Sequence, residues 1–310
     1  MLAEDFRPIS IQVTFSKIFE MVLLNQIEDF TNKKGIFSDI QFGFRRRVSS
    51  ITLLRQVNYR IRNSLNQGAL SVLVLLDFSK AFDTLDHEIL LLKLAKLGFD
   101  ANSLRLILNY LRPRFVRSIK NDNTSDWVEV NAGVPQGSIL GPLLFNIYCS
   151  DLKENLPNDI SLFQYADDCQ ILFNFTSQSS FDFIKLKIKN VLKCAQLWSE
   201  KNFLCLNKNK TQVLPIFNRN SVFCKMPFFE KNLDDDFNFQ TEAKNLGVHY
   251  NVSFNWNAHF RELQSSCRKV FHFLRHFFTR YTCHKDNFLR LTMSFTELFG
   301  FLHHLLVLKL

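Results

Sequence analysis

The sequence lacks the features of a secreted or membrane-anchored protein. Its seven cysteines are an odd number and none forms a Cys-x-x-Cys pair, which argues against a disulfide framework and against a zinc knuckle. No signal peptide precedes residue 20, and the apolar run 298–310 is too short to span a bilayer and is interrupted by His303 and His304. We therefore expect an intracellular protein of the nucleus or cytoplasm, not secreted and without a membrane partner.

Internal repeats and linker-like segments are also missing, so the 310 residues are expected to form one large domain or two smaller ones. A content of 46% hydrophobic and 22% charged residues is typical of a folded chain and excludes a disordered one. The net charge of +9 fits a polyanionic partner, although many basic proteins bind none. Phenylalanine is abundant, at 34 residues, and we attribute most of these to A/T-rich coding rather than to a binding surface.

Hydrophobic periodicity predicts a mixture of helices and strands. Helices are expected at 12–30, 89–97, 104–111, 137–152, 181–198 and 259–278. Strands are expected at 70–77, 116–119, 127–130, 161–165, 169–173, 212–217 and 246–250. The sequence therefore predicts an α+β fold in which an antiparallel sheet has helices behind it.

Two acidic stretches lie at the ends of apolar runs. The first is Leu76-Asp77-Phe78-Ser79-Lys80-Ala81-Phe82-Asp83, and the second is Tyr165-Ala166-Asp167-Asp168. Asp77 alone would be read as a strand-end acid or a helix cap. Carboxylates from two strands in a basic chain call for a counter-ion, and hard oxygen ligands suit Mg²⁺. A pair of such ions is the apparatus for phosphoryl transfer.

Further motifs stand before, between and after these stretches. In chain order the seven blocks are Arg7-Pro8-Ile9-Ser10 with Ser16-Lys17-Ile18-Phe19-Glu20, Gln41-Phe42-Gly43-Phe44-Arg45, the first acidic stretch with Asp86-His87, Gly133-Val134-Pro135-Gln136-Gly137-Ser138 with Gly141-Pro142, the second acidic stretch, Leu206-Asn207-Lys208-Asn209-Lys210-Thr211, and Asn245-Leu246-Gly247-Val248. Over about residues 7–250 the chain resembles the reverse transcriptases of non-LTR (LINE-type) retrotransposons, particularly jockey-like elements.

The resemblance implies an RNA-directed DNA polymerase with a right-hand fingers–palm fold and an antiparallel palm sheet. It implies partial fingers at 1–69, a palm with some fingers segments at 70–255, and the start of a truncated or degenerate thumb at 256–310. The implied partners are an RNA template, a DNA primer, dNTPs and an RNA-binding protein encoded by the same element. Likeness to the family fades past about residue 280, and upstream fingers segments are missing, so we expect a partial copy.

The same resemblance assigns catalytic roles. Asp77, Asp167 and Asp168 would bind two Mg²⁺ ions about 4 Å apart, with the backbone carbonyl of Phe78 as a further ligand. These ions would activate the primer 3′-hydroxyl and stabilise the departing pyrophosphate. Lys210 would protonate that pyrophosphate, although a solvated surface lysine is an equally good reading.

Arginine residues are expected to bind phosphates near this centre. By resemblance Arg45 reaches the triphosphate, which suits the bidentate fork of a guanidinium. Gly43 would let the backbone bend close to a ligand. Arg46 and Arg47 would face either the template backbone or water.

Other residues of the motifs are expected to shape what enters the site. Phe82 would act as a steric gate against a 2′-hydroxyl, with an ordinary core phenylalanine as the alternative. Gln136 and Gly137 would line the template and nucleotide site, because a turn at this glycine lets a base pair approach the backbone. We assign structural roles to the acidic and histidine residues that follow Phe82, namely Asp83, Asp86 and His87.

Two other functions stay open at this point. The chain could be a catalytically inactive retroelement relic or an RNA-binding module, which its shortened ends favour. A two-metal nuclease would explain the aspartates but neither Phe82 nor the turn at Gln136 and Gly137.

Overall fold

The computed structural model describes residues 10, 12–37, 40–45, 48–117, 119–120, 123–229 and 237–281. The Arg7-Pro8-Ile9 part of the first motif, Arg46, Arg47 and the tip of the hairpin near residue 121 lie outside the described residues. So does most of the expected thumb segment, from residue 282 onward.

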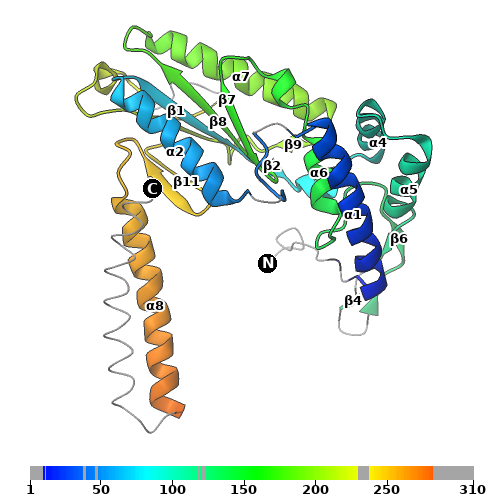
Figure 1. The fold of residues 1–310 in the computed structure, drawn as a ribbon. Helices are drawn as coiled ribbons and strands as arrows, with labels where there is room; N and C mark the ends of the chain where they lie inside the picture. Colours follow the sequence, from blue (N-terminus) through cyan, green and yellow to red (C-terminus); the bar gives the residue numbers. More distant parts are fainter. Residues whose placement is uncertain are drawn as a thin grey trace.

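A four-stranded antiparallel sheet, ordered β10-β1-β8-β7, forms the centre of the fold (Figure 1). Its strands are β1 (Leu70–Leu76), β7 (Ser161–Tyr165), β8 (Asp168–Phe175) and β10 (Gln212–Ile216). The run of Leu and Val in β1 is buried almost throughout, as expected for a strand with packed layers on both faces. The predicted antiparallel sheet is thus confirmed.

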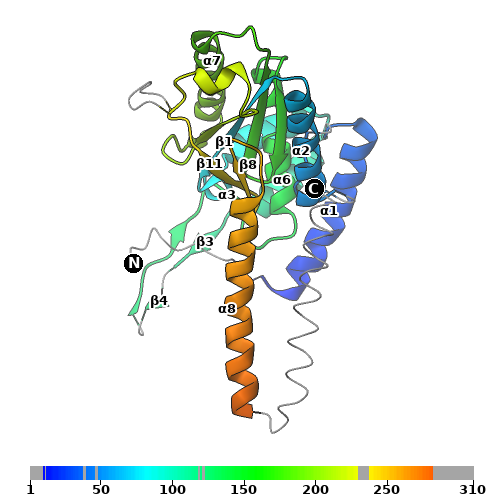
Figure 2. The ribbon, with the colours of Figure 1, turned by 90° about the vertical axis from the view of Figure 1, so that its left-hand side faces the viewer.

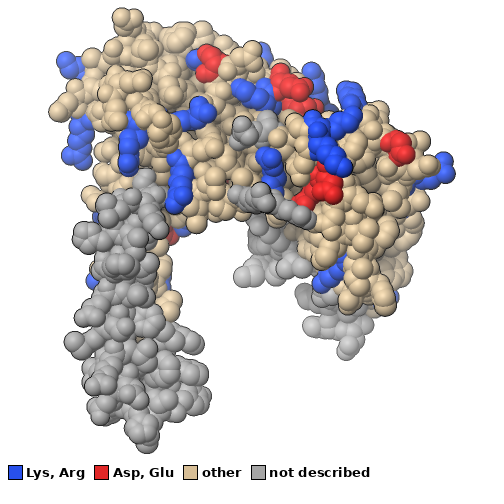
Figure 3. Space-filling view, viewed as in Figure 1, with Lys and Arg blue, Asp and Glu red and all other residues tan. Residues whose placement is uncertain are grey.

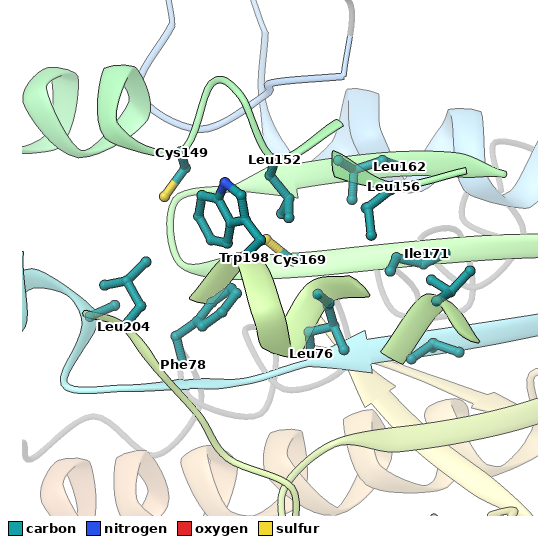
Figure 4. Close-up of a cluster of buried hydrophobic side chains, with 14 of the residues drawn as sticks. Leu76, Phe78, Cys149, Leu152, Leu156, Leu162, Cys169, Ile171, Trp198 and Leu204 are labelled. Carbon is teal, nitrogen blue, oxygen red and sulfur yellow. The ribbon is translucent and has the colours of Figure 1, made fainter. Parts of the chain in front are cut away.

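Helices and a large hydrophobic core cover one face of the sheet. The amphipathic helix α7 (Phe181–Lys201) turns Ile184, Ile188 and Trp198 toward it, at the spacing that the sequence predicts. Figure 4 shows the Trp198 ring among Leu76, Phe78 and Cys169, which directly flank Asp77 and Asp168 in the sequence. The ends of β1 and β8 are therefore held by a tightly packed apolar cluster.

The opposite face is covered as well, which the sequence analysis did not predict. Helix α2 (Ser50–Asn66) and the hairpin of β11 (Glu242–Asn245) and β12 (Val248–Asn251) pack there against Leu73 and Leu172. The sequence analysis predicted helices behind the sheet but predicted neither α2 nor β11, which cover its other face. Strand β12 begins at Val248, since Leu246 and Gly247 form the turn of this hairpin with positive φ angles of 45° and 84°.

Helix α1 (Thr14–Lys34) confirms the predicted N-terminal helix, but its buried face differs from the expected one. Ile18, Met21 and Val22 are all more than half exposed. The buried stripe contains Glu20, Leu23, Ile27 and Thr31 instead. A polar contact of Glu20, described below, fixes the rotation of the helix.

Shorter elements connect these layers. The predicted helices at 89–97 and 104–111 are α4 (His87–Lys96) and α5 (Ala101–Leu111), and the predicted hairpin pairs β3 (Phe115–Val116) with β6 (Val128–Glu129) and β4 (Ile119–Lys120) with β5 (Asn123–Thr124). The helix expected at 137–152 is shorter, because α6 spans Gly141–Tyr148 and residues 137–140 form turns and bends before it.

Helix α8 (Asn257–Tyr281) extends away from the body of the molecule (Figure 2). At its base Glu262 pairs with Lys244 at 2.8 Å and with His249, both from the β11–β12 hairpin. Lys and Arg side chains outnumber acids on the face in Figure 3, in line with the net charge. Among the described residues no helix combines the length and apolar character needed to cross a bilayer.

Candidate active site

The three predicted aspartates meet at one end of the central sheet. Asp77 follows the last residue of β1, and Asp168 is the first residue of β8. The register pairs Leu76 with Cys169, so one further step along both strands places Asp77 opposite Asp168. Asp167 lies beside them in the two-residue turn that joins β7 to β8. The fold therefore brings together backbone positions that are distant in the sequence.

The turn that carries Asp167 is strained and closely supported. Ala166 has a φ of 58°, a left-handed conformation that is costly for a residue with a side chain. Gly43 packs directly against it, and a Cβ at Gly43 would lie only 2.3 Å from the Ala166 nitrogen. The Asn146 side chain also donates a hydrogen bond to the Gly43 carbonyl at 2.7 Å. Gly43 thus permits a close approach to the aspartate turn, where the sequence had suggested a ligand.

The acids at this end of the sheet remain in contact with solvent. The Asp77 side chain is 40% exposed, Asp167 is half-buried and Asp168 is exposed. Cys169, the next residue, is buried in the core. Burial, with the nearby charges of Asp168 and Asp167, raises the pKa of the Cys169 thiol to about 12, so this thiol stays protonated.

A second short ladder brings Lys210 to the site. Strand β2 (Phe78–Ser79) pairs with β9 (Cys205–Leu206), and the Asn207 amide donates to the Asp77 carbonyl at 2.8 Å. The turn that follows places Lys210 Nζ 3.9 Å from Asp77 Oδ2. Lys210 is 69% exposed, so its ammonium can face a ligand as well as the carboxylate.

Phe78 has its ring in the core, so only its backbone is available at this end of the sheet. Its ring is buried, 6.1 Å from that of Trp198, and therefore cannot face a ligand. Antiparallel ladders alternate between residues that bond across and residues whose carbonyls point outward. The Asp77 carbonyl accepts from the Asn207 amide and so points toward β9. The carbonyl of the next residue, Phe78, therefore points away from β9.

The expected Gln136-Gly137 turn lies against the segment after Asp77. The Gln136 amide nitrogen donates to both carboxylate oxygens of Asp83, at 2.8 and 2.9 Å. Gly137 is exposed and has a φ of 96°, which favours glycine. The Val134 amide donates to the Phe82 carbonyl at 2.8 Å, while the half-buried Phe82 ring stacks on Phe145 with centroids 4.5 Å apart.

Buried polar groups hold this turn from behind. His87 is fully buried, with Nε2 2.8 Å from the Gly133 carbonyl and Nδ1 accepting from Arg112 at 2.9 Å. Arg114 donates to the same Gly133 carbonyl at 2.6 Å. Burial lowers the pKa of His87, and the charges of both arginines add to that effect. Asp86 caps α4 through its side chain, so the structural roles expected for Asp86 and His87 are confirmed.

Glu20 is a structural anchor that the sequence analysis did not single out. Its carboxylate is fully buried and accepts from the Ile139 and Leu140 amides at 2.6 and 3.0 Å, and from Gln12. It therefore ties α1 to the residues just before α6. Its helical spacing from Leu23 and Ile27 could have revealed it as part of the buried stripe.

Arg45 lies on the α2 side of the sheet end. It donates to the Gln41 carbonyl at 3.0 Å, and its guanidinium is 5.7 Å from the centre of the Phe37 ring. It lines a groove of about 880 Å³ together with α2 residues such as Thr52 and Arg60.

The donor set fits Mg²⁺ in kind. Carboxylates of Asp77, Asp167 and Asp168 and the carbonyl of Phe78 are hard oxygen ligands, and solvent can complete their coordination. However, across the described ranges no three His, Cys, Asp or Glu side chains approach closely enough to hold a metal ion. The strand ends converge, whereas their carboxylate oxygens do not yet form a closed site.

Comparison with known proteins places this geometry in context. The family described as "Reverse transcriptase (RNA-dependent DNA polymerase)" matches residues 3–250. The chain is 28% identical over 274 residues to the probable RNA-directed DNA polymerase from transposon BS of Drosophila melanogaster, covering 85% of this chain and 29% of that protein. It is 28% identical over 222 residues to the polymerase from mobile element jockey of the same species, covering 70% and 24%. The chain thus spans less than a third of either relative.

A solved structure shares the fold. Apo telomerase from Candida tropicalis, truncated from its C-terminal domain, superposes with a TM-score of 0.50 at 13% identity, over 77% of this chain and 45% of that one. At this identity the likeness concerns the fold alone.

Proposed function

This chain belongs to the reverse transcriptase (RNA-dependent DNA polymerase) family, and on that premise we propose that it carries out RNA-templated DNA synthesis. The observation that carries the proposal is the register of β1 and β8, which sets Asp77 opposite Asp168 with Asp167 in the adjoining turn. The reaction joins a dNTP to a primer 3′-hydroxyl and releases pyrophosphate.

The three aspartates and the Phe78 carbonyl hold two Mg²⁺ ions in this proposal. Bound ions supply charge neutralisation at the attacking and leaving oxygens. Asp77 keeps a half-exposed carboxylate for this purpose, while its backbone is fixed by Asn207. Lys210, 3.9 Å from Asp77, gives a proton to the departing pyrophosphate.

Substrate recognition is assigned to residues around these acids. Arg45 binds the triphosphate from the groove beside α2. Phe82, supported on Phe145, blocks a 2′-hydroxyl on the incoming sugar. Gln136 and the exposed Gly137 line the template and nucleotide site.

The proposal also assigns the parts of a right-hand polymerase. Residues 1–69 are assigned to the fingers, 70–255 to the palm with some fingers segments, and 256–310 to the start of the thumb, which includes α8. The partners are an RNA template, a DNA primer, dNTPs and an RNA-binding protein from the same element. Basic residues hold the template through its phosphates, so affinity should fall steeply between about 50 and about 200 mM salt.

A second candidate is an inactive relic or RNA-binding module that keeps this fold. It is favoured by the side chains of the described residues, among which no three His, Cys, Asp or Glu groups close around a metal. Primer extension on an RNA template with Mg²⁺ separates the two functions, with RNA binding measured on the same samples.

The decisive variant is Asp167→Ala, and Asp182→Ala on the exposed surface of α7 is the matched control. Incorporation by the parent chain and the control, lost in Asp167→Ala, supports polymerase activity. RNA binding without incorporation in any of the three proteins supports the second candidate and overturns the first.

A further inference from the structure

We propose that Asp83 is a positioning residue that fixes which end of the Gln136 amide faces bound nucleic acid. The amide carbonyl would then accept a hydrogen bond from a sugar hydroxyl. This inference rests on the proposed function, because it concerns what the same site recognises.

The contact between the two side chains has a defined direction. Gln136 Nε2 lies 2.8 and 2.9 Å from the two oxygens of the Asp83 carboxylate. An ionised carboxylate only accepts hydrogen bonds, so the nitrogen end of the amide must face it. The carbonyl oxygen at the other end points away and, in the described part of the chain, receives no hydrogen bond.

The backbones that carry the two residues are locked together. Asp83 lies in the single-turn helix α3 (Ala81–Thr84). On either side of it, the carbonyl of Phe82 accepts a hydrogen bond from the Val134 amide at 2.8 Å, and the carbonyl of Leu85 accepts one from the Gly133 amide at 2.7 Å. The contact therefore joins two fixed segments, so Asp83 meets Gln136 in one geometry. Both residues are only partly buried, so the pair lies at the surface of the site and not inside the core.

An acceptor at this position discriminates between sugars. The 2′-hydroxyl of an RNA template can donate to it, whereas a DNA template has no such group. The 3′-hydroxyl of the incoming nucleotide is the other donor of the same chemistry. Without Asp83 the amide can rotate, and the acceptor is no longer held in place.

Binding measurements test this without requiring any chemistry. We would compare the affinity for a dideoxy-terminated primer on an RNA template and on a DNA template of identical sequence. A second arm compares the complementary dNTP with its 3′-deoxy analogue in stabilising the complex. The variants are Asp83→Asn, Gln136→Leu and the double variant. Asp83→Glu tests rescue, and Glu88→Gln on exposed α4 controls for the change in charge.

We expect Asp83→Asn and Gln136→Leu each to lower one of the two preferences by about 3- to 10-fold, the range for one neutral hydrogen bond. The double variant should match Gln136→Leu alone, because Asp83 acts through Gln136. A loss in the first arm assigns the template hydroxyl, and a loss in the second assigns that of the nucleotide.

Unchanged preferences in Asp83→Asn, or additive losses in the double variant, would overturn the inference. If the parent chain incorporates dNTPs but these preferences do not respond, this inference fails alone. If the chain binds neither primer–template, the proposed function fails as well. Thermal unfolding of each variant shows whether a loss reflects misfolding.

Discussion

The sheet end and the Gln136 turn (residues 133–141) lie next to each other but are stabilised in opposite ways. At the sheet end the Asp77 carboxylate is 40% exposed, and Lys210 approaches it only to 3.9 Å. Behind the turn, Glu20 and His87 are fully buried and hydrogen-bonded to its backbone groups. The carboxylate at the sheet end thus stays accessible to solvent, whereas the backbone of the turn beside it is held in place in the absence of any ligand. Substitutions at the sheet end should therefore lower activity more than stability, and substitutions behind the turn should lower stability.

The largest effect should come from Asp77→Asn. Losing one of the carboxylates proposed to bind metal should remove several kcal/mol of transition-state stabilisation, which is about 1,000-fold in the rate of incorporation. The unfolding free energy should change by less than about 0.5 kcal/mol, because the side chain is part-exposed. Primer extension and urea denaturation measure the two quantities. A large loss of stability would contradict the contrast between the regions.

Glu20→Ala, in contrast, should lower the free energy of unfolding substantially. It leaves the part-buried Ile139 amide and the buried Leu140 amide without their acceptor, at a cost of about 3 kcal/mol. Urea denaturation measures it, with Glu154→Ala at an exposed position as the control. A cost equal to that of the control would show that the turn does not depend on this anchor.

Phe82→Val sharpens the comparison, because Phe82 lies in the segment after Asp77 and is hydrogen-bonded to the turn. Its carbonyl bonds to Val134 and remains in the variant, while the ring that stacks on Phe145 is removed. We expect ribonucleotide incorporation to rise about 10- to 100-fold relative to dNTP. Competitive primer extension measures the ratio. An unchanged ratio would identify Phe82 as a core residue.

The smallest expected effect is a pH dependence at His87. Burial lowers its pKa below the ordinary value of 6.5, so the unfolded chain takes up a proton below about pH 6.5 before the folded chain does. Stability is complete above that pH and falls by about 1 kcal/mol per pH unit below it. The free energy of unfolding, measured by urea denaturation, should fall less between about pH 8 and about pH 5.5 in His87→Gln than in the parent chain. His259, whose pKa is also lowered, contributes equally to the pH dependence of both proteins. An equal fall in the two proteins would therefore show that His87 is not the source of the effect.

These regions also differ in how well the sequence predicts them. The strands and the position of the aspartates follow from local apolar runs that end in acid, so β1, β7 and β8 could be recognised directly. The partner of Gln136 could not, because Asp83 is 53 residues away and its position near Phe82 suggested a local cap. Nothing in the local pattern of a polar residue identifies a distant acceptor.

Helices show the same limit. The buried side of α7 follows from its apolar stripe, and α2 carries the stripe Leu53, Val57 and Ile61 that could have predicted it. In α1 the apolar residues at Ile18 and Met21 pointed to the wrong face. The rotation of that helix is set by hydrogen bonds that the Glu20 carboxylate accepts from the Ile139 and Leu140 amides, far along the chain.

Helix α8 is long and is attached to the body of the molecule at one end. Its 25 residues extend for about 37 Å, so a rotation of about 10° at the base moves the far end by about 6 Å. At that base the carboxylate of Glu262 binds both Lys244 and His249 on a two-stranded hairpin. A small rotation of this hairpin would therefore displace the far end of α8 much more than it displaces the hairpin itself.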